Sequence, residues 1–356
     1  MRRKSVGARV RRIYGEKTII LAKKLKLFEG KFKVRSDRDF VYIPLVHKPS
    51  EDELKELTSQ VPDIEVSTCA FPEKAERVAT LADLLDGKLA PHLIASLPRS
   101  ADVVGNIAII EVPAELEAHE ALIGEALLKT NKNVKTVLAK AGAVSGPYRL
   151  REFRVIAGEA STVTIHKEYG CQYYVDLAKA YFSPRLSYEH HRVASLVHEG
   201  ETVLDLFAGV GPFAVQIAKA RENVKVYAVD ANPYAIEFLK KNVRLNRVED
   251  KVFPILGDAG DVVEEKMSGV VDRVIMNLPE RAADFISAAC KALKPAGGVV
   301  HFYRFVKASD SLESVQVGFA EAVEQCGRKV GKILFSRLVR ATAPYEWQSV
   351  LDVQVI

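Results

Sequence analysis

The segment ETVLDLFAGVGPFAVQIAKA, residues 201–220, decides the fold expected for the C-terminal half of this 356-residue chain. It begins with a run typical of a buried strand, passes through a loop with glycines at positions 209 and 211, and continues as an apolar helix. Glycines let a loop turn tightly and bring its backbone close to a ligand, and the start of the helix presents unpaired N–H groups. The segment therefore predicts a strand, a ligand-binding loop and a helix in succession.

Strand-like and helix-like runs alternate after this segment. Strands are indicated by KVYAVD, KVFPILGD, DRVIMNLP and GGVVHFYRF, with helix-like runs between most of them. This alternation is typical of a doubly wound α/β sheet. The tail differs, because VGKILFSRLVRATAP and EWQSVLDVQVI are two consecutive strands joined by a turn at Pro344-Tyr345. The sheet is therefore expected to contain an antiparallel strand near the C-terminus.

Three regions are expected along the chain. Residues 1–65 form a small α+β domain, which rests on the helix-like KTIILAKKLKLF and the strand-like DFVYIPL. Residues 66–165 form a second α+β domain, in which VVGNIAIIEV predicts a strand or hairpin and PAELEAHEALIGEALLKT an amphipathic helix. Residues 166–356 form the α/β sheet. The expected fold class is thus α/β and Rossmann-like, with two smaller α+β domains before it.

Polar residues stand where the strands of the expected sheet end. Asp205 ends the first strand, Asp230 the second and Asp258 the third, and Asn277-Leu278-Pro279 follows the fourth. Ligands of open α/β sheets bind outside the carboxyl ends of the strands. An acid at the end of the second strand can bind a ribose, and an amide can hold the edge of a base. These residues are therefore candidates for one ligand site.

The ligand of the glycine loop has two readings. The pattern Gly209-x-Gly211-x-x-Ala214 fits the dinucleotide fingerprint, which would make the chain a nucleotide-dependent oxidoreductase. Asp205, however, would repel a pyrophosphate and suits a cationic ligand such as the sulfonium and ammonium groups of S-adenosylmethionine. Purely structural roles are open as well, since Asp205 could cap a helix or brace the loop, and Asn277-Leu278-Pro279 could be a turn.

Charge is unevenly distributed along the chain. Residues 1–35 contain 13 Lys and Arg and two Glu, a formal charge of +11, so the remainder carries −6 of the total of +5. A basic segment on a mildly acidic body indicates a polyanionic partner such as a nucleic acid. The alternative is a solvated basic surface without a partner.

Other classes of protein are disfavoured. No run approaches the ~18 apolar residues of a membrane span, and MRRKSVGARVRR at the N-terminus is not followed by the apolar stretch of a secretory signal. The four cysteines lack the spacing of metal ligands, so we expect no metal site and a reducing, cytoplasmic location. They are Cys69, Cys171, Cys290 and Cys326. We also expect a monomer.

Longer motifs are more specific than the glycine loop. They are RLREFRVIAGE (149–159), IHKEYGCQYYVDLAKAYFSPRLSYEHHR (165–192), DLFAGVGPF (205–213), YAVDANPYAIEFLKKNVRLN (227–246) and RVIMNLP (273–279). In these motifs the chain resembles the archaeal and eukaryal tRNA (guanine-N1)-methyltransferases, which act on the guanosine 3′ of the anticodon. The resemblance is dense from about residue 102 to residue 279. The basic N-terminal region matches the family's extra domain only in position and character.

The resemblance implies a class I methyltransferase domain that binds S-adenosylmethionine, a middle domain that helps clasp the anticodon arm, and a first domain that contacts tRNA away from the target. Glu189 is implied as the catalytic base, Arg149 as the group facing guanine O6, and Asn277 and Pro279 as the pair that positions the guanine. Arg185 is a candidate phosphate contact. The implied cofactor-binding residues are Tyr181, Asp205, Phe207, Gly209, Gly211, Asp230, Ala231, Asp258 and Asn277.

The chemistry of the base is consistent with this set. Guanine N1 carries a proton at neutral pH, so methylation needs a group that removes the proton and a cation that stabilises charge on O6. A desolvated glutamate and an arginine meet these needs. Simpler roles stay open: Glu189 could be a first-turn helix acid, Arg149 could contact a phosphate, and Arg151 could replace it.

Two further functions remain as alternatives. One is methylation of a wyosine-type purine at the same tRNA position, which the Asn-Leu-Pro motif disfavours. The other is a non-enzymatic RNA-binding protein with a vestigial fold, which the retained acids disfavour.

Overall fold

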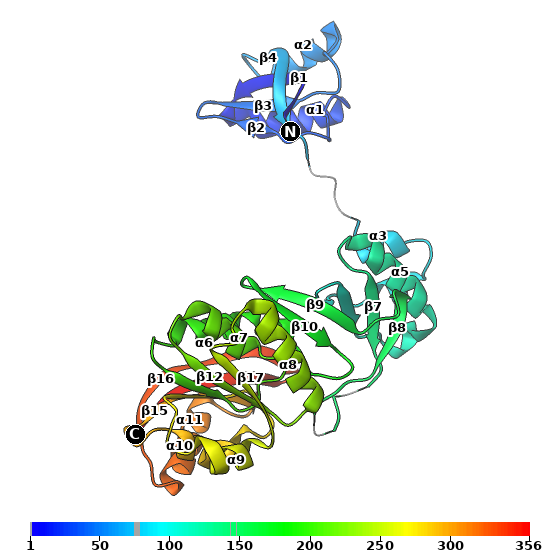
Figure 1. Ribbon diagram of the computed structural model, residues 1–356. Helices are drawn as coiled ribbons and strands as arrows, with labels where there is room; N and C mark the ends of the chain where they lie inside the picture. The colour runs from blue at the N-terminus through cyan, green and yellow to red at the C-terminus, as the bar shows by residue number, and fades with distance from the viewer. Residues whose placement is uncertain (1, 75–78, 143, 147) are drawn as a thin grey trace. The chain divides into compact units, whose positions relative to one another are not determined.

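The computed structural model describes residues 2–74, 79–142, 144–146 and 148–356, and the chain divides into two compact units, Met1–Val78 and Ala79–Ile356 (Figure 1). The first unit is an antiparallel sheet in the order β2-β3-β1-β4 with two helices. Alternating apolar residues of β1 and β3 pack on the helices in one hydrophobic core. Its elements are β1 (Arg2–Arg11), α1 (Gly15–Lys24), β2 (Arg35–Ser36), β3 (Phe40–Pro44), α2 (Glu51–Gln60) and β4 (Glu65–Pro72).

Strand β4 corrects the first expected domain boundary. It pairs with β1 along its whole length, from Glu65 opposite Arg9 to Pro72 opposite Arg2. A domain ending at residue 65 would remove this strand and leave one side of β1 without its hydrogen-bond partners. The sequence EVSTCAFP has an irregular burial pattern, which explains why its strand character was not recognised.

The second unit begins with a four-stranded sheet in the order β5-β6-β7-β8, in which only the β6–β7 pair is parallel. Helix α5 packs on one face of this sheet and closes a separate hydrophobic core. The predicted hairpin and amphipathic helix of this region are thus confirmed. The elements are α3 (Leu81–Leu85), α4 (Pro91–Ala95), β5 (Asp102–Val104), β6 (Ile107–Ile110), α5 (Glu120–Thr130), β7 (Thr136–Lys140) and β8 (Phe153–Gly158).

A two-stranded hairpin, β9 (Val163–Glu168) and β10 (Cys171–Asp176), follows. The expected boundary between residues 165 and 166 falls inside β9. Two hydrogen bonds join this hairpin to the turn between β5 and β6. Gly105 N–H donates to His166 Nδ1 at 3.2 Å, and Asn106 N–H donates to Thr164 Oγ1 at 3.1 Å.

Two asparagines of helix α8 (Pro233–Asn246) bind the backbone of β10 as a neighbouring strand would. Asn242 accepts from Tyr174 N–H at 2.6 Å and donates to Tyr174 C=O at 3.1 Å, and Asn246 makes the same pair of bonds to Gln172. Asn242 also donates to Val210 C=O in the glycine loop at 2.9 Å. The spacing of four along a helix thus matches the spacing of two along a strand, and it ties the hairpin to the ligand loop.

The last part of the unit is a seven-stranded sheet in the order β13-β12-β11-β14-β15-β17-β16. Its first five strands are parallel and β17 is antiparallel to both of its neighbours, which confirms the predicted fold. Helices cover both faces (Figure 1). The strands are β11 (Thr202–Asp205), β12 (Lys225–Asp230), β13 (Val252–Leu256), β14 (Arg273–Met276), β15 (Gly298–Lys307), β16 (Val330–Ala343) and β17 (Glu346–Val355).

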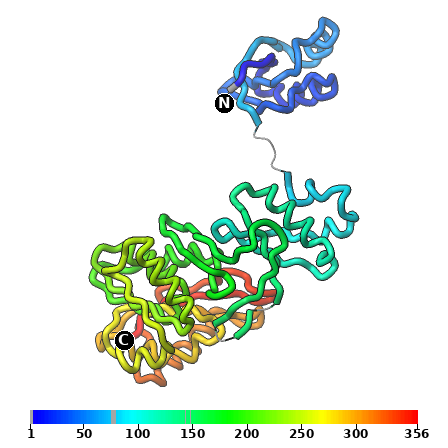
Figure 2. The backbone as a smooth tube through the Cα atoms, turned by 45° about the vertical axis from the view of Figure 1, so that its right-hand side comes forward, coloured from blue at the N-terminus to red at the C-terminus, as the bar shows by residue number. Residues whose placement is uncertain are grey.

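The two faces of this sheet carry different sets of helices. One hydrophobic cluster joins the sheet to α6 (Ser187–Leu196), α7 (Pro212–Ala220) and α8, and another joins it to α9 (Ala259–Val262), α10 (Ile286–Ala292) and α11 (Leu312–Gln325). Figure 2 shows the C-terminal hairpin, in red, beside the green segment that contains α6. The antiparallel ending therefore brings residues from the end of the chain to the face that α6 covers.

Candidate active site

A cavity of about 230 Å³ lies at the carboxyl ends of the parallel strands, where the sequence places the candidate ligand site. Nine of the predicted site residues line it: Arg149, Tyr181, Phe207, Gly209, Asp230, Ala231, Asp258, Asn277 and Pro279. Four others, Asp205, Gly211, Arg185 and Glu189, are not part of its lining. The fold thus gathers residues that are up to 130 positions apart in the sequence into one wall, as a doubly wound sheet does.

The glycine loop needs its glycines for two different reasons. Gly209 has a φ of +55° and its N–H donates to Asp230 Oδ2 at 2.7 Å, so it forms part of the cavity wall. Gly211 has a φ of +89°, and a Cβ there would lie 2.1 Å from Cδ1 of Leu239. Gly211 therefore allows the loop to pack against α8 and is structural in this conformation.

The carboxyl of Asp205 is fully buried and has few hydrogen-bond partners. Its Oδ1 accepts one long hydrogen bond of 3.4 Å from Phe207 N–H, and its Oδ2 has no partner among the described residues. Burial raises the pKa of this carboxyl to about 8. Its chain neighbours Leu206 and Phe207 line the cavity. A buried carboxyl with an unpaired oxygen beside a cavity fits a cationic ligand, and the bond to Phe207 is too long to make loop bracing its main role.

Asp230 and Asp258 are oriented by the backbone. Asp230 Oδ1 accepts from Asn232 N–H at 2.8 Å while Oδ2 holds Gly209, and burial raises the pKa of Asp230. Asp258 caps α9 by accepting from Gly260 N–H at 2.8 Å. Both carboxyls line the cavity. They are suited to bind hydroxyl or amine groups of a nucleoside.

Other lining residues of the cavity suit a base. Arg149, with a φ of +55°, forms an ion pair with Glu280 Oε2 at 2.7 Å, and its guanidinium carbon lies 5.5 Å from the ring centre of Tyr181. Arg151 instead donates to Gly142 C=O at 2.6 Å and is not part of the lining. The structure therefore separates the two arginines between which the sequence could not choose, and it favours Arg149.

Two cavity residues from the C-terminal hairpin were not predicted. Arg340 donates to Tyr181 Oη at 3.3 Å, to Ser183 Oγ at 3.1 Å and to Gln348 Oε1 at 3.0 Å. Gln348 in turn donates to Asn277 Oδ1 at 3.0 Å, which leaves the Asn277 NH₂ group as its donor toward a ligand. The available signal was the glutamine near the start of the strand sequence EWQSVLDVQVI.

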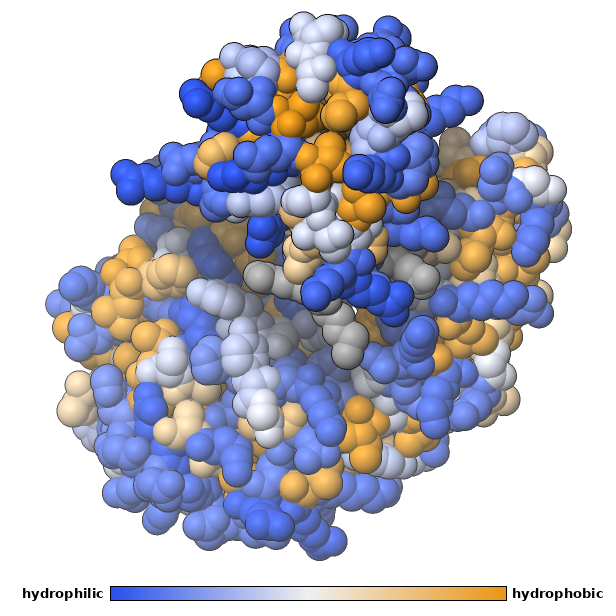
Figure 3. All heavy atoms as spheres, turned by 90° about the horizontal axis from the view of Figure 1, so that it is seen from above, coloured by the Kyte–Doolittle hydropathy of each residue, from blue (hydrophilic) through white to orange (hydrophobic). Residues whose placement is uncertain are grey.

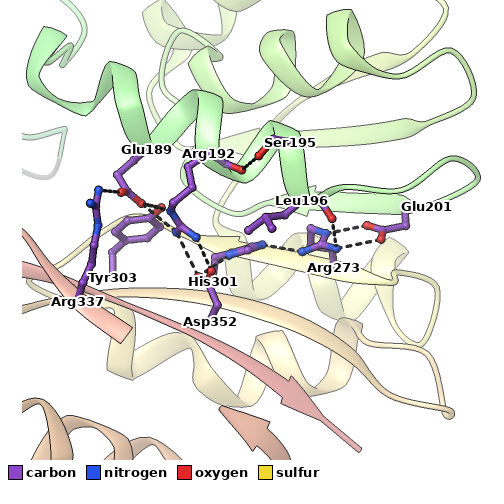
Figure 4. Close-up of polar contacts among 10 residues, drawn as sticks. All are labelled: Glu189, Arg192, Ser195, Leu196, Glu201, Arg273, His301, Tyr303, Arg337 and Asp352. Atoms are coloured by element: carbon purple, nitrogen blue, oxygen red, sulfur yellow. Dashed lines mark hydrogen bonds and ion pairs between the residues drawn. The ribbon is translucent and has the colours of Figure 1, made fainter. Parts of the chain in front are cut away.

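Glu189 and Arg185 lie outside the cavity wall. Glu189 is 1% exposed and is held by Arg192, Arg337 and the hydroxyl of Tyr303 (Figure 4). Arg185 forms an ion pair with Asp102 at 2.6 Å and is half-exposed. The catalytic role of Glu189 and the phosphate contact of Arg185 therefore stay predictions.

Figure 3 shows a face of the molecule on which hydrophilic residues predominate and hydrophobic residues form smaller groups. In the part of the chain that the structure describes, no helix is long and apolar enough to cross a membrane. The same residues contain no group of three or more His, Cys, Asp or Glu that could hold a metal ion.

Comparison with known proteins shows similarity over most of the chain. Residues 164–330 match the TRM5/TYW2 methyltransferase domain, residues 81–162 the TYW2 N-terminal domain and residues 7–53 the tRNA methyltransferase 5 N-terminal domain. The chain is 37% identical to the tRNA (guanine(37)-N(1))-methyltransferase Trm5b of Pyrococcus abyssi over 93% of both chains. The chain belongs to the TRM5/TYW2 methyltransferase family. It is also 34% identical to the tRNA 4-demethylwyosine(37)-methyltransferase Taw21 of Saccharolobus solfataricus, over 71% of this chain and 92% of that protein.

Solved structures of this family have the same fold. The complex of aTrm5 with tRNALeu matches with a TM-score of 0.72 at 33% identity and covers 98% of this chain and 99% of that one. The M. jannaschii TYW2 in complex with AdoMet matches with a TM-score of 0.55 at 27% identity and covers 72% of this chain and 99% of that one. The Rossmann-like class I methyltransferase sheet expected from the resemblance is thus confirmed.

Proposed function

We propose that this chain transfers a methyl group from S-adenosylmethionine to N1 of the guanosine at position 37 of tRNA. One observation carries the proposal. A single cavity joins the strand-end acids, which suit the cofactor, to Arg149, Asn277 and Pro279, which suit a guanine. The Pyrococcus abyssi relative, which matches nearly the full chain, is named for this reaction.

The residues of the strand ends fit S-adenosylmethionine. Asp230 and Asp258 would hold its hydroxyl and amine groups, and the buried carboxyl of Asp205, with its unpaired Oδ2, would face its positive charge. Tyr181 and Phe207 add aromatic surface to the same wall. When bound, the cofactor supplies an electrophilic methyl group on a sulfonium sulfur. A neutral or anionic ligand would gain less electrostatic binding energy from the carboxylate of Asp205.

The guanine side requires removal of a proton and stabilisation of O6. Arg149 presents a fork of N–H donors and would donate to O6 as negative charge develops there. Asn277, fixed through Gln348, would position the base with its free NH₂ group. Glu189 would accept the N1 proton. The base has to leave its stack in the anticodon loop to enter the cavity.

A second candidate is methylation of a wyosine-type purine at the same position. The Taw21 relative supports it, since it is 34% identical to this chain. That match covers 71% of this chain, however, whereas the Trm5b match covers 93% and the N-terminal region matches the tRNA methyltransferase 5 N-terminal domain. Unmodified guanosine is therefore the favoured substrate. Membership of a methyltransferase family argues against the oxidoreductase reading of the glycine loop.

The first unit supports a contact with tRNA away from the target base. Its first 35 residues carry +11, and many of the basic side chains are exposed, among them Lys23, Lys24 and Lys26 near the end of α1. Replacing these three lysines by alanine should weaken tRNA binding and make it less dependent on salt, while the rate at saturating tRNA is unchanged. A monomeric state and a cytoplasmic location stay predictions.

The function is tested with purified protein, labelled S-adenosylmethionine and unmodified tRNA transcripts that carry guanosine or adenosine at position 37. Nucleoside digestion should yield N1-methylguanosine from the guanosine transcript alone. Glu189→Gln should keep tRNA binding and lose methyl transfer, whereas the matched surface variant Glu249→Gln should behave as the wild type. Absence of methyl transfer to guanosine 37, with transfer to a transcript bearing 4-demethylwyosine, would establish the second candidate instead.

A further inference from the structure

The two oxygens of the Glu189 carboxylate have different partners. Oε2 accepts from the Tyr303 hydroxyl at 2.9 Å and from Arg192 Nε at 3.0 Å. Oε1 accepts from Arg337 Nη2. In this conformation Glu189 is buried and does not line the cavity. A catalytic base at this position has to move toward the cavity before it can accept a proton from a substrate held there.

The contacts to Oε2 are backed by further buried groups (Figure 4). Arg192 Nη1 donates to Asp352 Oδ2 at 2.5 Å, and Asp352 Oδ1 lies 2.6 Å from His301 Nδ1. His301 Nε2 lies 2.8 Å from Nη1 of Arg273, which can only donate, so the proton of His301 is on Nδ1 and points to Asp352. Burial lowers the pKa of His301 and keeps it neutral. Each member thus fixes the next, which makes Arg192 a fixed partner of Glu189.

Arg337 is a different kind of partner. It belongs to β16, the edge strand of the sheet, and its side chain is 34% exposed, whereas that of Arg192 is 10% exposed. Its guanidinium lies 4.7 Å from the ring centre of Tyr188, which is itself exposed, and its Nε has no hydrogen-bond partner among the described residues. A partly exposed ion pair contributes less to stability than a buried, hydrogen-bonded one. Arg337 is therefore the partner from which Glu189 separates most readily.

The strand geometry places Arg337 next to the cavity. Register shifts in β16 put Arg337 opposite Val350 and Arg340 opposite Gln348, so both arginines lie on the same face of the hairpin although they are three residues apart. Arg340 and Gln348 line the cavity. The backbone of Arg337 therefore lies about 7 Å, one two-residue step along the paired strands, from that of Arg340.

We propose that Arg337 is an exchangeable counter-ion that masks Oε1 of Glu189 in the free enzyme and is transferred to an RNA phosphate when tRNA binds. The proposal rests on the function proposed above. Arginine suits this exchange, because its planar fork binds carboxylate and phosphate in the same way. Glu189 then stays anchored through Oε2 by Arg192 and Tyr303, and Oε1 is free to turn toward the substrate.

The exchange also provides a base when it is needed. With Arg337 in place, the carboxylate faces two cations, Arg192 and Arg337, of which Arg192 is shared with Asp352. Loss of one cation makes a carboxylate more basic. The N1–H bond of guanine then breaks, its proton moves to Oε1, and the N1 electron pair forms the bond to the methyl carbon while the former carbon–sulfur pair stays on sulfur.

The test compares Arg337→Gln with Arg337→Lys, which keeps the charge, and with Arg192→Gln, which removes the fixed partner. For Arg337→Gln, the tRNA dissociation constant should rise severalfold and the slope of log affinity against log salt should fall by about one. Arg337→Lys should restore the slope. Arg192→Gln should leave the slope unchanged and lower the saturating rate, because it releases Oε2.

The pH profiles provide a second readout. The profile of kcat/KM reports the free enzyme and that of the saturated single-turnover rate reports the complex. In Arg337→Gln the acid limb of kcat/KM should move to higher pH, and the limb of the saturated rate should not move. The groups that contact Glu189 are Arg192 on α6, Tyr303 on β15 and Arg337 on β16. Asp352 on β17 binds Arg192, and His301 on β15 binds Asp352.

Each other result overturns the proposal. If both limbs move, Arg337 stays on Glu189 in the complex. If neither limb moves and the salt slope is that of the wild type, Arg337 only joins β16 to α6, and thermal melting of Arg337→Gln measures that structural role. A wild type that methylates guanosine 37 separates these failures from failure of the proposed function.

Discussion

The buried carboxyl of Asp205 makes a quantitative prediction about cofactor binding. With a pKa of about 8, raised by burial, this group is about 90% protonated near pH 7 in the free protein. A sulfonium held beside it favours the charged form and expels the proton. S-adenosylhomocysteine has the same adenosine, amino and carboxylate groups but a neutral sulfur. Binding of S-adenosylmethionine should therefore release up to about 0.9 proton more than binding of S-adenosylhomocysteine near pH 7.

The sign of the pH dependence follows from the same shift. Because the folded-state pKa lies above the ordinary value, the free protein binds more protons than the unfolded chain between about pH 4 and pH 8, and this group makes the folded state less stable as pH rises through that window. The affinity for S-adenosylmethionine should rise with pH over the same window, since fewer protons have to be expelled from Asp205 on binding. The extra proton release should fall to about 0.1 at pH 9.

Isothermal titration calorimetry in two buffers with different ionisation enthalpies measures the released protons directly. Asp205→Asn should abolish the difference between the two ligands and weaken S-adenosylmethionine more than S-adenosylhomocysteine. Asp261→Asn, at an exposed position in α9, serves as the matched control and should keep the difference. Equal proton release by the two ligands in the wild type, or an undiminished difference in Asp205→Asn, would refute the placement of Asp205 beside the sulfonium.

Three further variants test the scaffold and the cavity. Gly211→Ala should lower the melting temperature clearly more than Gly209→Ala. Gly211 has a φ of +89°, and a Cβ there would lie 2.1 Å from Leu239, whereas a Cβ at Gly209 would lie 3.7 Å from its nearest atom. Asn242→Ala should destabilise the fold by about 2–4 kcal/mol in urea unfolding, because it leaves three buried or part-buried backbone groups without their side-chain partner. Arg340→Gln should leave the melting temperature unchanged and reduce kcat/KM by roughly tenfold or more in steady-state assays, since its contacts to two cavity residues, Tyr181 and Gln348, are lost.

Much of the fold could be predicted because its signals are local. The strand, glycine loop and helix of residues 201–220 follow directly from hydrophobic periodicity and glycine chemistry, and the two consecutive C-terminal strands required an antiparallel neighbour. Strand β4 was not recognised, because its hydrogen bonds are made to β1, more than fifty residues away, and its own pattern is irregular. The same holds for Asn242, whose role depends on the hairpin that packs against its helix.

The candidate site also contains residues that could be predicted from the sequence and residues that could not. Asp230, Asp258 and Asn277 were predicted because the carboxyl ends of parallel strands always meet at one edge of a sheet. Arg340 and Gln348 were not predicted, because a side chain in a hairpin reaches the cavity only through the register and the bulges of its strand. The environment of Glu189 is also a tertiary property, since its partners come from α6, β15 and β16.

The sequence by itself determined the fold class, because it depends on hydrophobic periodicity and on residue types at fixed local spacing, and its longer motifs indicated the family and the cofactor through their resemblance to known methyltransferases. The tertiary structure alone decided which arginine faces the cavity, that Asp205 is buried with an unpaired oxygen, and that one oxygen of Glu189 is covered by Arg337. These properties depend on distance, burial and the direction of hydrogen bonds, and such quantities arise only when distant segments of the chain pack together.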